Sequence, residues 1–90
     1  MERISEHISY KEGIKSNTAT RLGIKNTPDD YQITNMVNIG VNVFEPLRKY
    51  VGGPIRISSF YRCEKLNRAI GGSSRSQHCE GRAIDLDDTL

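Results

Sequence analysis

The sequence has no long apolar run. None of its 90 residues lies in a stretch that approaches the roughly 20 consecutive apolar residues needed to cross a bilayer. Its first residues, MERISEHISYKEG, also lack the apolar core of a signal peptide. We therefore expect no membrane insertion, and synthesis in the cytoplasm without a signal peptide.

Cysteine and net charge are also scarce. Two cysteines, Cys63 and Cys79, are too few for a disulfide scaffold, so free thiols are expected. The 13 basic and 11 acidic residues leave a net charge of +2, which is too small to imply a nucleic-acid or membrane partner. The arginines of the second half are scattered and lack interleaved aromatic residues, so nucleic-acid binding is the weakest functional hypothesis.

The length allows a single domain, which we place over residues 1–90. Its clearest element is a helix that follows NTPDD, with Thr27 expected as the cap and the glycine pair 52–53 as the end. Gly40 permits the close approach of a neighbour, and Pro46 is expected to kink or interrupt the helix. Apolar residues at spacings of three and four predict one buried stripe: Ile33, Met36, Val37, Val41, Phe44, Leu47 and Val51.

The remaining elements are predicted to be short. We expect a helical turn at 9–14 and then a loop, because the polar side chains of KSNTAT compete with helical hydrogen bonds. Alternating residues predict strands at 54–61 and 82–87, and CEKLNRAI predicts a helix at 63–70. The expected fold class is α+β: a small antiparallel sheet with the long helix of the N-terminal half and a short helix packed against it.

The last predicted strand suggests a site. Ile84 and Leu86 claim the core face, so Asp85 looks the other way beside the small Ala83. His78 can fold back over that space, where its imidazole and the carboxylate could both lie about 2.0 to 2.2 Å from one zinc ion. The alternative interpretation is an exposed histidine and a carboxylate on a polar strand face.

The stretch SQHCEGRAID has the pattern Ser-x-His-x-x-Gly-x-Ala-x-Asp. It resembles the metal-binding signature of the zinc D-Ala-D-Ala carboxypeptidases and of the related L-alanyl-D-glutamate endopeptidases of phages and bacteria. The segments ISSFYRCEKLNRAIGG, TATRLGIKNTP and FEPLR are similar to further parts of that family, so the resemblance covers most of the chain. It implies a DD-peptidase-like metallopeptidase domain.

The resemblance also implies roles for single residues. His78 and Asp85 match two of three Zn²⁺ ligands, Arg62 matches the arginine that binds the peptide carbonyl or carboxylate of the substrate, and Ser76 matches a serine near the substrate. The implied substrate is a peptidoglycan stem peptide, whose terminal carboxylate suits the donor fork of arginine. The alternative for Arg62 is a surface ion pair.

The sequence departs from the family in one respect. The third ligand and the general base lie downstream of the aspartate in the family, which places them beyond Leu90 here. We do not expect His7, Cys79, Glu80 or Asp87 to replace them. The expectation is therefore a domain that lacks its C-terminal segment and is inactive or nearly so, with an unpaired sheet edge that could recruit a second chain.

Two functions follow from these residues. The first is a zinc-dependent peptidase of the peptidoglycan-cleaving type, a carboxypeptidase or an endolysin that reaches the cell wall during lysis. The second is a non-catalytic phage or prophage module that grips cell-wall peptide through Arg62 and the loop 71–76.

Overall fold

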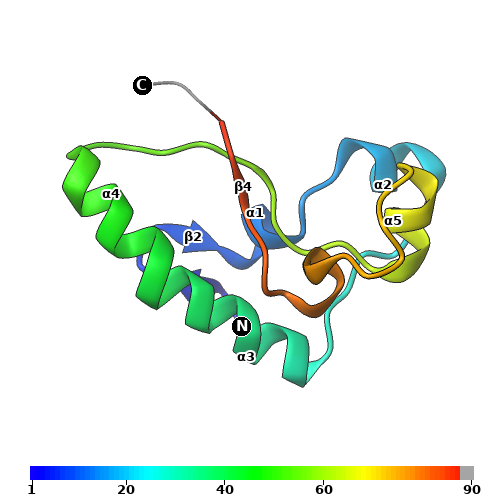
Figure 1. The fold of residues 1–90 in the computed structure, drawn as a ribbon, viewed down its shortest axis with the longest axis horizontal. Coiled ribbons are helices and arrows are strands. Elements are labelled where there is room, and N and C mark those ends of the chain that lie inside the picture. The colour runs from blue at the N-terminus through cyan, green and yellow to red at the C-terminus, as the bar shows by residue number, and fades with distance from the viewer. Residues whose placement is uncertain (88–90) are drawn as a thin grey trace.

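The computed structural model describes residues 1–87, and its fold is α+β as predicted. Two small antiparallel sheets replace the single expected sheet: β1 (Arg3–Ser5) pairs with β2 (Ile8–Ser9), and β3 (Ile57–Ser59) pairs with β4 (Asp85–Leu86). The α-helices are α1 (Tyr10–Ile14), α2 (Asn17–Leu22), α3 (Asp30–Ile39), α4 (Glu45–Val51) and α5 (Glu64–Ala69). In Figure 1 the α3 to α4 helix lies at the lower left, and α2 and α5 lie at the right.

The long helix runs without interruption past Pro46. α3 continues through a π-helical turn, η1 (Gly40–Phe44), directly into α4. The amide of Glu45 bonds to the carbonyl of Gly40, five residues back, and Pro46 falls in the first turn of α4. The irregularity expected at Pro46 is therefore a change of helical pitch at the π turn that precedes it. A proline is tolerated in the first turn of a helix, because the amide that it lacks needs no partner within that helix.

The start of this helix differs from the prediction, and its end does not. Asp29 is the cap in place of Thr27: its carboxylate accepts from the amide of Gln32, whose side chain accepts from the amide of Asp29. Such a reciprocal pair satisfies two amides at once, which a lone threonine cannot do. At the other end Gly52 has φ 80°, as expected of a glycine that ends a helix.

The buried stripe is only partly as predicted. Met36 and Phe44 are buried, and a Cβ at Gly40 would lie 3.0 Å from that of Ser5, so the expected close approach is confirmed. The prediction for Val41 and Leu47 was wrong, because their exposed fractions are 51% and 38%. Val41 lies within the wider π turn and Leu47 follows it, so both are displaced around the helix axis from their places in a regular helix. The main core consists of Ile4, Ile8, Met36, Phe44, Phe60 and Tyr61.

The N-terminal region holds more structure than the sequence indicated. α1 confirms the predicted turn, and Ile4 and Ile8 on β1 and β2 are buried. The loop expected after α1 was wrong, because α2 forms there. The hydroxyl of Ser16 accepts from the amide of Ala19, so a serine that would compete inside a helix here begins one.

The C-terminal half follows the prediction more closely. α5 begins after Cys63, whose thiol accepts from the amide of Leu66, and β3 occupies only part of 54–61. Ile84 and Leu86 pack against the core, as the alternation predicted. A 3₁₀ turn, η2 (Gln77–Glu80), precedes β4. Within residues 1–87, no helix combines the length and apolar character of a membrane span.

Candidate metal centre

His78 and Asp85, separated in sequence by a turn and a short loop, come together in the structure. His78 lies on η2 and Asp85 is the first residue of β4. Atom Nε2 of His78 is 3.3 Å from Oδ2 of Asp85. The histidine side chain is 10% exposed and the aspartate side chain 55% exposed, so the pair sits at the surface with the imidazole recessed.

The orientation of the His78 ring is set by the backbone. Its Nδ1 lies 2.6 Å from the carbonyl oxygen of Phe60. A carbonyl only accepts, so Nδ1 carries the hydrogen and donates it, which leaves Nε2 to face Asp85. Metal-binding histidines are held in this way, with one nitrogen bonded to a carbonyl and the other directed at the ion.

The gap between Nε2 and Oδ2 has the size that a zinc ion needs. When Nδ1 of His78 carries the only ring hydrogen, Nε2 is an acceptor, as is Oδ2 of Asp85. Two acceptors attract each other only through a proton or a cation placed between them. Two ligands of a tetrahedral ion with bonds of about 2.0 to 2.2 Å lie about 3.3 to 3.5 Å apart. The observed 3.3 Å falls in that range, and nitrogen with carboxylate oxygen is a donor set that zinc accepts.

Arg62 reaches the same carboxylate. Its guanidinium donates to Oγ of Ser59 at 3.0 Å, to Oδ1 of Asn67 at 3.2 Å and to Oδ2 of Asp85 at 3.2 Å. The Arg62 side chain is 15% exposed and that of Asp85 is 55% exposed, so the surface ion pair considered as an alternative is present. Three of the five N–H donors of Arg62 are thus engaged within the protein, and two are left for a ligand.

Ser76 supports the histidine turn. Its hydroxyl caps η2 by accepting from the amide of His78 at 3.3 Å. Ser76 also lines a cavity of about 460 Å³ beside that turn, together with Tyr31, Gln32, Glu64, Arg75 and Cys79. A cavity of this size suits a small ligand or a peptide end.

One family model, described as Peptidase M15, matches residues 6–89. The chain belongs to the Peptidase M15 family. The family consists of peptidases, which are zinc-dependent in general. No curated protein and no solved structure matches the chain.

Other side chains near the site of this M15 chain are engaged elsewhere. Burial, followed by the charge of Glu64, raises the pKa of the Cys79 thiol, which disfavours the thiolate that binds zinc. Glu80 lies 3.9 Å from Arg82, and Asp87 lies 3.6 Å from Arg56.

A second group of potential ligands was missed at the sequence level. Among residues 1–87, the three such side chains whose ligand atoms lie within 4.8 Å of one another are Glu6, His7 and Glu45. No spacing could reveal this group, because Glu45 lies 38 residues beyond His7. Within the described part of this M15 chain, no third ligand joins His78 and Asp85 in this way.

Both carboxylate oxygens of Glu45 are engaged in hydrogen bonds. Its Oε2 accepts from the hydroxyl of Ser5 and the amide of His7, and its Oε1 lies 2.6 Å from Nδ1 of His7. Partial burial opposes its ionisation, but these bonds outweigh that effect and lower the pKa of Glu45. The group therefore forms an ion pair between the β1–β2 turn and α4.

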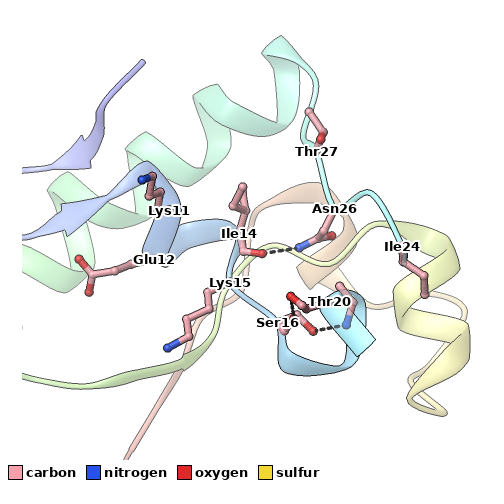
Figure 2. Close-up of a pocket in the computed structure, with 10 residues that line it drawn as sticks. Lys11, Glu12, Ile14, Lys15, Ser16, Thr20, Ile24, Asn26 and Thr27 are labelled. Carbon is pink, nitrogen blue, oxygen red and sulfur yellow. Dashed lines mark hydrogen bonds between the residues drawn. The ribbon is translucent and has the colours of Figure 1, made fainter. Parts of the chain in front are cut away.

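The M15 chain also has a cavity of about 410 Å³ beside α1 and α2. Figure 2 shows Lys11 and Lys15 among its lining residues, and Asn26 donating to the carbonyl of Ile14. Asn26 is buried and donates also to the carbonyl of Tyr61, so its role is to join the two halves of the chain. None of the residues lining this cavity belongs to the His78–Asp85 site.

Proposed function

We propose that the chain is a domain of a zinc-dependent peptidase of the type that hydrolyses peptidoglycan stem peptides, with His78 and Asp85 as two of its zinc ligands and with little or no activity of its own. The observation that carries the proposal is the 3.3 Å gap between Nε2 and Oδ2, with Nδ1 of the same ring bonded to a carbonyl. An ordinary surface pair needs neither the recessed ring nor the second bond.

Each residue has a defined task in this proposal. His78 presents a nitrogen in a fixed direction, and Arg62 donates to Oδ2 of Asp85, the same carboxylate oxygen that faces the imidazole. A zinc ion in such a site supplies Lewis acidity to a scissile carbonyl and lowers the pKa of water. The two remaining donors of Arg62 can bind a peptide carbonyl or carboxylate, and the cavity beside Ser76 offers room for the peptide.

Zinc titration of the wild type and of His78→Ala and Asp85→Ala tests the ligand roles. We expect zinc affinity to fall by about 100-fold or more in both variants, since losing an outer-shell group alone costs 10- to 100-fold. Asp87→Ala is the matched control, because Asp87 follows on from the same strand but pairs with Arg56. Wild-type affinity in Asp85→Ala, or no zinc binding by the wild type, contradicts the proposal.

Mass spectrometry of stem peptides incubated with the zinc-loaded chain tests the substrate class. Because no third ligand joins His78 and Asp85 within residues 1–87, we expect slow cleavage at most, which a chelator should abolish and zinc should restore. A second candidate, a non-catalytic module that binds cell-wall peptide, is favoured by the absence of a third ligand beside His78 and Asp85 within residues 1–87. Peptide binding that ignores the chelator, without cleavage, distinguishes this module from the peptidase.

A further inference from the structure

The turn that carries His78 is too short to satisfy its own carbonyls. η2 has four residues, and the last carbonyls of a helical turn have no partner within it. Two amide side chains of α3 supply the donors. Nε2 of Gln32 donates to the carbonyl of Cys79 at 3.0 Å, and Nδ2 of Asn35 donates to the carbonyl of Glu80 at 2.9 Å.

Gln32 is held at both ends of its amide. While Nε2 bonds to Cys79, Oε1 accepts from the amide of Asp29 at 2.8 Å and so completes the cap of α3. A side chain fixed at two points retains little rotamer freedom, so it can hold the turn at a set distance. Asn35 lies three residues further on, which places it on the same face of the helix.

Gly81 brings the turn against the helix. Its φ is +76°, and a Cβ at this position would lie 2.5 Å from the carbonyl oxygen of Gln32 and 2.8 Å from Cγ of Met36. Only glycine therefore allows the two segments to meet this closely. In Figure 1 the turn before β4 lies above the N-terminal half of α3.

The opposite side of the turn is held by the segment around Phe60. The carbonyl of Phe60 bonds to the His78 ring, and the amide of Arg62 donates to the carbonyl of His78 at 3.2 Å. Position and direction of the ring thus depend on contacts from both sides. We propose that Gln32 and Asn35 are positioning residues that hold the imidazole of His78 in place beside Asp85. This role rests on the proposed function only where zinc affinity is used to test it.

Gln32 allows two reciprocal substitutions. Gln32→Glu keeps the oxygen that caps Asp29 and loses the donor to Cys79, whereas Gln32→Lys keeps a donor and loses the cap. The first measurement is made on the metal-free chain: NMR of ¹⁵N-labelled histidine reports solvent exchange of the Nδ1 hydrogen of His78. We expect exchange to quicken about tenfold in Gln32→Glu and to stay near the wild-type rate in Gln32→Lys.

Asn35→Asp removes the second donor, and Asn38→Asp is its control. Asn38 lies on α3, is exposed, and accepts from Asn42, so Asn38→Asp makes the same charge change away from the turn. Faster exchange in Asn35→Asp but not in Asn38→Asp supports the proposal. Equal exchange in all four variants and the wild type overturns it, as does an equal increase in both aspartate variants.

Zinc affinity is the second readout. Loss of a supporting contact typically lowers metal affinity 10- to 100-fold, and we expect about tenfold in Gln32→Glu and Asn35→Asp. Faster exchange with no zinc binding by any chain, the wild type included, upholds the positioning role and rejects the proposed function. Zinc binding by the wild type with unchanged exchange and affinity in the variants upholds the function and rejects the positioning role.

Discussion

Two histidines of this chain meet a carboxylate, and the two contacts differ. Nδ1 of His7 lies 2.6 Å from Oε1 of Glu45, whereas Nε2 of His78 lies 3.3 Å from Oδ2 of Asp85. The shorter distance is that of a charge-assisted hydrogen bond, which is complete without another atom. The longer distance is that of a weaker ion pair, and it is also the spacing that the proposed zinc site requires of two ligands.

The surroundings of the two histidines differ in the same sense. The His7 side chain is 35% exposed, on the turn between β1 and β2, and its partner Glu45 also accepts from Ser5 and from the amide of His7. The His78 side chain is 10% exposed, and its other nitrogen is bonded to Phe60. Of the two histidines, His78 has the fixed second nitrogen and the longer contact at the first that the proposed zinc site requires.

The largest effect on stability is expected from a substitution of Gly81, where the turn that carries His78 packs against α3. Gly81→Ala meets a strained φ of +76° and overlaps the backbone of Gln32, so we expect a loss of about 3 kcal/mol in the free energy of unfolding. Gly52→Ala is the control, because Gly52 has φ +80° with nothing within 4 Å, and about 1 kcal/mol is expected there. Urea unfolding measures both, and equal losses would contradict the close contact.

Zinc binding should stabilise the folded chain only where His78 is kept. At 100 times its dissociation constant, zinc should stabilise the folded chain by about 2.7 kcal/mol. We expect this gain in the wild type and in His7→Ala, and no gain in His78→Ala. Thermal unfolding with and without zinc measures it. A gain that disappears in His7→Ala and persists in His78→Ala would place the ion at the other histidine.

The His7 side is broken by Glu45→Gln, with a smaller effect of about 1 kcal/mol because the ion pair is partly exposed. The lowered pKa of Glu45 makes its contribution complete above the ordinary value of 4.5 and lost as the pH falls through the lowered pKa. We therefore expect the free energy of unfolding, measured in urea from about pH 7 down to about pH 3, to fall less steeply in Glu45→Gln than in the wild type. Glu6→Gln makes the same charge change on the same turn, and an identical decline there would contradict the role of Glu45.

The local features of the fold could be predicted from the sequence. Gly52 at a helix end and Ile84 and Leu86 on one strand face depend on neighbouring residues alone. The residues alone left two alternatives for His78 and Asp85, a shared site or two unrelated surface side chains, and the resemblance to the peptidase family decided the prediction that they approach. The zinc role of the pair stays a prediction.

Features that depend on distant partners could not be predicted in this way. The β1–β2 turn is anchored by Glu45, and the His78 turn by Gln32, which lies 47 residues before its partner Cys79. The exposure of Val41 and Leu47 follows from a π turn, which no spacing rule for a regular helix anticipates. A serine side chain can either compete with helical hydrogen bonds or cap the start of a helix, and the sequence does not show which. Ser16 caps α2.

The smallest effect on stability at neutral pH is expected from a substitution of Tyr61, which lies between Phe60 and Arg62, the two residues whose backbone bonds to His78. Burial, followed by the charges of Cys63, Asp29 and Cys79, raises its pKa from 10.0 to about 12. The folded state therefore keeps the phenol proton longer than the unfolded state. Its contribution to stability is complete below pH 10.0 and is lost as the pH rises through about 12.

Tyr61→Phe should remove this alkaline dependence. We expect the difference in unfolding free energy between variant and wild type to change from about pH 10 to 12 and to stay constant between about pH 6 and 9. Tyr50→Phe is the matched control, because Tyr50 is 89% exposed and its removal should leave the alkaline decline as in the wild type. If Tyr61→Phe and Tyr50→Phe follow the same curve, the phenol of Tyr61 is not held neutral by the segment that anchors His78.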